Sequence, residues 1–76
     1  MSNHFSAANA FLRSKNFNKA IDLYEKCIKE DPTFSYYYEN IAIAYFEIGE
    51  YKKAKEMMIG ALENSSESSK KAIKKY

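Results

Sequence analysis

The chain's single histidine and single cysteine are the first candidates for acid–base or covalent chemistry. His4 carries a potential general base or metal ligand, and Cys27 carries a potential nucleophile. No partner His, Cys or Asp stands near His4 in a pattern typical of a metal or catalytic site. Cys27 occupies a position where a small packing residue is expected. We therefore expect His4 at the surface, Cys27 buried and inert, and no catalytic site, metal or cofactor.

Aromatic and basic residues suggest a second kind of chemistry, the binding of nucleic acid. Tyr36, Tyr37 and Tyr38 could stack on bases while lysines near residue 70 contact phosphates. However, the formal net charge of +2 is too small to indicate such a partner. The lysine-rich segment also lacks the apolar face of a membrane-binding helix, and no stretch approaches the roughly 20 apolar residues that span a bilayer. The sequence therefore predicts no nucleic-acid or membrane partner.

Length and composition are those of one small globular domain. The chain has 76 residues, of which 46% are hydrophobic and 29% charged. A single cysteine excludes an internal disulfide and a zinc site built on several cysteines. The first residues lack the basic start and apolar run of a signal peptide. These features predict a cytoplasmic protein.

The elements that position these residues follow an internal repeat of 34 positions. The repeat pairs small, apolar and charged residues of the two halves: Ala8 with Ala42, Ala10 with Ala44, Phe11 with Tyr45, Phe17 with Tyr51, Lys19 with Lys53 and Ala20 with Ala54. This period is typical of helix-turn-helix solenoids, which bind partners along a concave surface.

Helical periodicity and turn residues place five helices in this plan. We expect them at about 3–14, 18–29, 36–48, 51–64 and 70–76, with a serine-rich connector at 65–69. Lys15 and Asn16 form the first turn, because Asn tolerates left-handed backbone conformations. Pro32 ends the second helix, and Ser35 caps the third. Gly49 is the expected left-handed residue after the third helix.

These residues resemble the tetratricopeptide repeat. The family's first helix carries a large apolar residue, Leu, a small residue and Tyr, and its second helix carries Ala, an aromatic residue, Ala and a closing Pro. Those places hold His4, Ala7, Ala8, Phe11, Ala20, Tyr24, Cys27 and Pro32 in the first unit, and Tyr38, Ile41, Ala42, Tyr45, Ala54, Met58, Ala61 and Ser66 in the second. Departures from the pattern are His4 for a bulky apolar residue and Ser66 for the second proline.

The resemblance implies an all-α fold, in which antiparallel helix-turn-helix repeats stack as a short right-handed α-solenoid. Repeat 1 would span residues 1–34, repeat 2 residues 35–68, and a partial C-terminal capping helix residues 69–76. Ala8 and Ala42 would let paired helices approach closely. Ala20, Ala54, Cys27 and Ala61 would do the same between hairpins, where a larger residue costs about 1–3 kcal/mol. Met58 is expected in the core and Met57 on the stacking surface.

The resemblance also implies that the first helix of each pair lines a concave groove. The groove positions that we select as candidate binding residues are Phe5, Asn9, Leu12, Arg13, Tyr36, Asn40, Ile43, Phe46, Lys70 and Lys74. Apolar anchors beside a few polar groups suit an extended peptide or a partner helix.

Some members of this family hold the C-terminal carboxylates of chaperone tails in a carboxylate clamp. The clamp positions here are Phe5, Asn9, Asn40, Lys70 and Lys74. Asn9 and Asn40 would donate amide hydrogen bonds, and the two lysines would supply positive charge. Arg13, one turn from Asn9, would assist. The clamp is incomplete, because Phe5 replaces a Lys and Lys74 an Arg. In the alternative interpretation, these are ordinary polar residues of the groove.

The sequence thus predicts a non-catalytic protein–protein interaction module that binds a peptide or helix, with an acidic C-terminal chaperone tail as the specific candidate. Two alternatives remain open. One is a self-associating scaffold that forms a homo-oligomer through the truncated third repeat, and the other is an N-terminal appendage of a larger enzyme.

Overall fold

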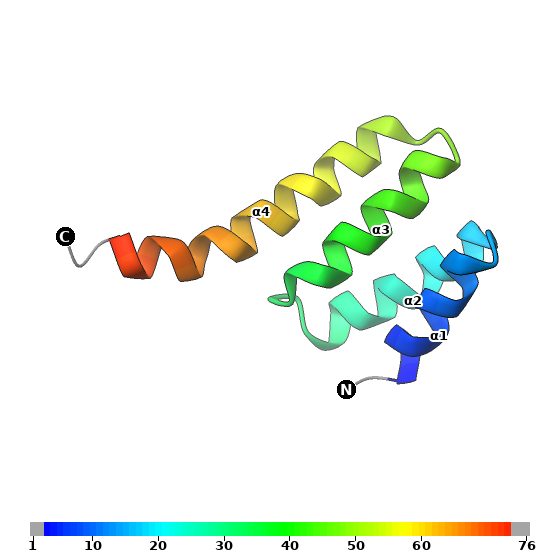
Figure 1. Ribbon diagram of the computed structural model, residues 1–76, viewed down its shortest axis with the longest axis horizontal. Coiled ribbons are helices and arrows are strands. Elements are labelled where there is room, and N and C mark those ends of the chain that lie inside the picture. Colours follow the sequence, from blue (N-terminus) through cyan, green and yellow to red (C-terminus); the bar gives the residue numbers. More distant parts are fainter. Residues whose placement is uncertain (1–2, 74–76) are drawn as a thin grey trace.

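Four α-helices form the fold in a computed structural model that describes residues 3–73 and, of their side chains, those through residue 64. They are α1 (Asn3–Arg13), α2 (Phe17–Glu30), α3 (Ser35–Glu47) and α4 (Tyr51–Ile73). Figure 1 shows them as two helical hairpins, with α3 packed against the first hairpin. The described residues contain no strand. The predicted all-α helical repeat fold is confirmed.

The two hairpin turns repeat each other residue by residue. Lys15 has a φ of 65° and Gly49 a φ of 84°, so the left-handed residue occurs at the same place in both units. In each turn, the next N–H closes the preceding helix by donating to a carbonyl five residues back: Asn16 to Phe11 at 2.8 Å, and Glu50 to Tyr45 at 2.9 Å. Gly49 is the left-handed residue that was predicted. In the first turn that residue is Lys15, whereas Asn16 has a φ of −93°.

A cation–π contact also recurs and explains why lysine is found at both equivalent positions. The Lys19 ammonium lies 5.5 Å from the centroid of the Phe11 ring, and the Lys53 ammonium lies 5.7 Å from that of Tyr45. Such contacts at exposed sites stabilise a fold by about 0.5–1 kcal/mol. Each one ties the start of the second helix of a hairpin to the end of the first.

The connection between the hairpins is fixed by polar side chains. Asp31 Oδ1 accepts hydrogen bonds from the backbone N–H and the hydroxyl of Thr33, at 3.2 and 2.7 Å. The Tyr38 hydroxyl donates to the Pro32 carbonyl at 2.8 Å. Ser35 is the first residue of α3, and the capping position is Phe34, which makes no side-chain capping bond. The prediction that Ser35 caps this helix is therefore wrong.

α4 is longer than the sequence predicts. It continues without a break through the expected connector at 65–69 to Ile73. The segment contains no Pro or Gly, and Ser66 stands where a proline would stop the helix. The division into two repeats and a capping helix at 69–76 stays a prediction from the sequence. Figure 1 shows the far end of α4 projecting beyond the other helices. Residues 74–76 lie outside the described part of the chain.

Small residues at the helix contacts are buried as predicted. Ala8, Ala20, Cys27, Ala42, Ala54 and Ala61 are all between 0 and 7% exposed. The largest fully buried side chains are Tyr24 and Ile41. Met58, which was expected in the core, is 45% exposed, whereas Met57 packs against the core.

No helix in the described part of the chain is long and apolar enough to cross a membrane. The cytoplasmic location stays a prediction from the sequence.

Candidate functional site

A polar cluster of Asn9, Tyr24 and Asn40 lies where α1, α2 and α3 meet. The Tyr24 hydroxyl donates a hydrogen bond to Asn9 Oδ1, and Asn40 Nδ2 donates to the same oxygen at 3.1 Å. A carboxamide oxygen has two lone pairs, so these two donors saturate it. They fix which way the Asn9 amide is turned and direct its N–H groups away from both partners. The cluster can therefore present amide donors to an acceptor that approaches from outside.

Burial keeps the Tyr24 phenol neutral. Its side chain is fully buried, and this burial raises the pKa of Tyr24 to about 12, against the opposing effects of Asn40 and Arg13. The hydroxyl is therefore a hydrogen-bond donor throughout the neutral pH range. In the sequence, Tyr24 is recognised only as the aromatic residue of the repeat's second helix, and its role in orienting Asn9 is not predicted. No local pattern signals this role, because Tyr24 reaches the two asparagines from a different helix.

An aromatic cluster lies beside the polar cluster. Phe5 contacts Tyr37, with ring centroids 5.1 Å apart, and Phe34, at 6.1 Å. Phe34 in turn packs edge-on against Tyr36 at 5.3 Å. Phe5, which stands at the first lysine position of the clamp, is thus a half-buried packing residue rather than a source of charge. Tyr36 is the exposed member of this aromatic wall, at 58%.

The remaining predicted groove residues divide into three groups. Leu12 is partly buried against the core, and Arg13 is exposed at the end of α1, one turn beyond Asn9. Ile43 and Phe46 line an apolar depression that they share with α4. Lys70 lies on the distal part of α4, where side chains are not described, and Lys74 is outside the described residues. Among the described side chains, the structure therefore joins Asn9 with Asn40, and the prediction for the two lysines falls outside them.

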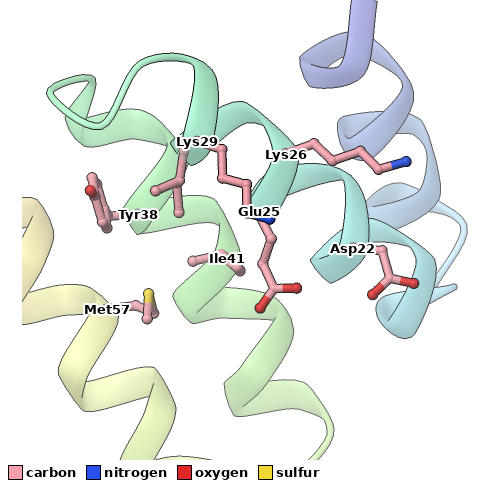
Figure 2. Close-up of a pocket in the computed structure, with 8 residues that line it drawn as sticks. Asp22, Glu25, Lys26, Lys29, Tyr38, Ile41 and Met57 are labelled. Carbon is pink, nitrogen blue, oxygen red and sulfur yellow. The ribbon is translucent and has the colours of Figure 1, made fainter.

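A further depression of about 630 Å³ lies between α2, α3 and α4 (Figure 2). It is lined by Asp22, Glu25, Lys26, Ile28, Lys29, Tyr38, Ile41 and Met57. Its charges are of both signs, and Glu25 already accepts a hydrogen bond from the Tyr45 hydroxyl at 3.3 Å. Among the described residues, no three His, Cys, Asp or Glu side chains are grouped in a way that could hold a metal. We assign no chemistry to this depression.

The two residues considered for catalysis, Cys27 and His4, contact other parts of the helical framework. Cys27 is fully buried in the helix contacts. His4 Nδ1 lies 3.4 Å from Glu30 Oε2, which links the start of α1 to the end of α2.

Comparison with known proteins matches two overlapping stretches of this chain to one family. Models of the tetratricopeptide repeat match residues 2–34 and residues 23–56. The mitochondrial import receptor subunit TOM70 of Saccharomyces cerevisiae is 36% identical over 69 residues, which is 88% of this chain and 11% of that protein. The Hsp70-Hsp90 organising protein of Plasmodium falciparum is 34% identical over 61 residues, which is 80% of this chain and 11% of that protein. The chain thus spans about a tenth of the length of these relatives.

Proposed function

Because the chain belongs to the tetratricopeptide repeat family, whose members mediate protein–protein interactions, we propose that its polar cluster binds the C-terminal carboxylate of an acidic peptide. One observation carries this proposal: Asn9 Oδ1 accepts from both Tyr24 and Asn40. With that oxygen occupied, Asn9 can meet a ligand only as a donor, and donors bind an anion.

The surroundings of the cluster suit such a peptide. Arg13 is exposed one helical turn from Asn9 and adds positive charge next to the amide donors. On the other side, Phe5 and Tyr36 offer an aromatic wall for the apolar side chains of the peptide. The similarity to an Hsp70-Hsp90 organising protein supports a chaperone tail as the source of the peptide. The proposal concerns this groove alone, because the chain matches only 11% of each relative.

The test compares two short acidic peptides that end in Asp, one with a free C-terminal carboxyl and one with a terminal amide. Fluorescence anisotropy of labelled peptides measures both affinities. A hydrogen bond to a charged group contributes about 1.5–3 kcal/mol, so amidation should weaken binding roughly tenfold or more. Equal affinities for the two forms would contradict the proposal.

A matched pair of variants localises the site. Arg13→Gln removes the cation beside Asn9, whereas Lys26→Gln removes an exposed cation of α2 that lies outside the groove. Only Arg13→Gln should weaken binding of the free-acid peptide, and the loss should shrink as salt is added. The alternatives of a self-associating scaffold and of an appendage to a larger enzyme stay predictions from the sequence.

A further inference from the structure

An apolar depression at the end of the helical stack, here called the end hollow, is formed by one face of α3 and α4. Its volume is about 560 Å³, and it is lined by Ala42, Ile43, Phe46, Tyr51, Ala54, Lys55 and Met58. Four of its side chains are unusually exposed for their size: Ile43 at 50%, Phe46 at 58%, Tyr51 at 63% and Met58 at 45%. Exposed apolar side chains gathered in this way mark an interaction surface.

The internal repeat relates this surface to the surface of the first hairpin that contacts α3. Each lining residue follows a residue of the first hairpin by 34 positions: Ala8, Asn9, Leu12, Phe17, Ala20, Ile21 and Tyr24, in the same order. In the first hairpin Ala8, Ala20, Ile21 and Tyr24 are buried, in one cluster with Ile41 and Ala44 of α3. The end hollow is therefore the second copy of the surface on which α3 is seated, and it continues that established interface.

The same comparison gives the shape of the occupant. α3 buries Tyr37, Ile41 and Ala44, which are spaced at i, i+4 and i+7. A helix with two bulky apolar residues and one small residue at this spacing would fill the end hollow as α3 fills the first site.

One substitution between the two copies sets the charge of the occupant. Ile21, which is buried in the first hairpin, is replaced by Lys55 in the second. Among the described residues, no carboxylate lines the end hollow, and Lys55 is exposed. A helix that covers Lys55 and carries a carboxylate would give the ammonium a counter-charge as it loses contact with water. We propose that the end hollow binds an amphipathic helix of a partner protein that carries a carboxylate opposite Lys55.

Two arrangements of a second copy of this chain do not meet this requirement. If two end hollows face each other, their described linings bring together two copies of Lys55 and contain no carboxylate. α1 contains no acidic residue, so a head-to-tail stack would not supply one. The segment 63–71 contains two glutamates but no apolar residue with which to fill the hollow. In these arrangements, the carboxylate must therefore come from another helix.

The probe is a synthetic helical peptide copied from residues 35–48. Glutamate replaces either Ala44, which shares the core cluster of Ile21, or Ile48, one turn further on. Peptides with glutamine at the same positions are the neutral controls. At least one glutamate peptide should bind the full chain, and its glutamine counterpart should bind about threefold more weakly. Absence of binding by both glutamate peptides would overturn the proposal.

Charge reversal on α4 tests the role of Lys55. Lys55→Glu should weaken binding of the glutamate peptide by roughly tenfold, because attraction becomes repulsion. Lys52→Glu makes the same change in charge on the same helix, outside the end hollow, and should leave binding unchanged. If Lys55→Glu and Lys52→Glu change the affinity equally, Lys55 does not pair with the glutamate of the peptide.

Two further measurements distinguish the end hollow from the groove and from a self-association surface. The acidic peptide used for the groove should not displace the helical peptide, since the polar cluster and the end hollow have different linings. Displacement would show that there is one site and would overturn the proposal. Sedimentation across a concentration series tests a second copy as occupant. A dimer that Phe46→Glu dissociates would assign the end hollow to self-association instead.

Discussion

Replacing Tyr24 by Phe removes one hydroxyl from the interior and separates the packing role of this residue from its role in the polar cluster. The ring is fully buried and keeps its volume in the variant, so no cavity forms. The lost interaction is the hydrogen bond that the hydroxyl donates to Asn9 Oδ1. Asn40 still donates to that oxygen at 3.1 Å, so the acceptor keeps one partner.

The expected loss of stability follows from these contacts. A hydrogen bond between neutral groups contributes about 0.5–1.5 kcal/mol net, and Asn9 is only half-buried, so water can replace the missing donor. We therefore expect a loss of about 1 kcal/mol in the free energy of unfolding. For a domain of this size, that loss lowers Tm by about 4–8 °C. Affinity for the free-acid peptide should fall as well, by about threefold, because the Asn9 amide is no longer held in one orientation.

Urea unfolding followed by circular dichroism gives the stability, and fluorescence anisotropy gives the affinity. Tyr51→Phe is the matched control, because it removes a hydroxyl from a tyrosine that is 63% exposed. A double-mutant cycle with Asn9→Ala should show a coupling of about 1 kcal/mol between positions 9 and 24. If Tyr24→Phe behaves like Tyr51→Phe, or if the cycle is additive, Tyr24 does not orient Asn9.

Three other predictions concern the backbone and the tyrosines. Lys15→Gly should stabilise the fold by about 0.5–1 kcal/mol, and Gly49→Ala should destabilise it by about 1–2 kcal/mol, because both positions are left-handed; thermal melts of the pair check this. Gly60→Ala should not give the usual helix gain of about 1 kcal/mol. The methyl group of the new alanine would lie 3.0 Å from the ring of Tyr38, whose hydroxyl is hydrogen-bonded to the Pro32 carbonyl. A Tm raised by several degrees would show that the ring moves aside and would contradict this prediction. Burial raises the pKa of Tyr24 to about 12. The neutral phenol therefore makes its full contribution to the free energy of unfolding below pH 10, and this contribution is lost as pH rises towards 12. Urea titrations should show a fall in stability above pH 10 that is smaller in Tyr24→Phe.

The repeat predicts those features that depend on residues within one unit. The left-handed Gly49 and the buried Ala20 and Ala54 follow from local turn chemistry and from the close approach of helices. The continuity of α4 does not follow from the repeat. A serine-rich segment without Pro or Gly can form either a connector or part of a helix. Met58 occupies the place of buried Tyr24, yet it is exposed because no helix among the described residues covers it. Burial in a repeat protein depends on the neighbouring unit, which the pattern of a single unit cannot supply.

The same dependence on neighbours explains how two equivalent surfaces acquire different chemistry. Where α3 is seated, Tyr24 and Asn40 both donate a hydrogen bond to Asn9 Oδ1, so three helices contribute to one polar cluster. At the end of the stack, Met58 and Ile43 stand in the places of Tyr24 and Asn9, so no such cluster can form there. We propose amide donors at the first surface as the binding site of a peptide carboxylate, and the apolar lining with Lys55 at the second surface as the binding site of a helix. Exchanging Met58 for Tyr should therefore not transfer carboxylate binding to the end hollow, because position 43 offers no amide to orient.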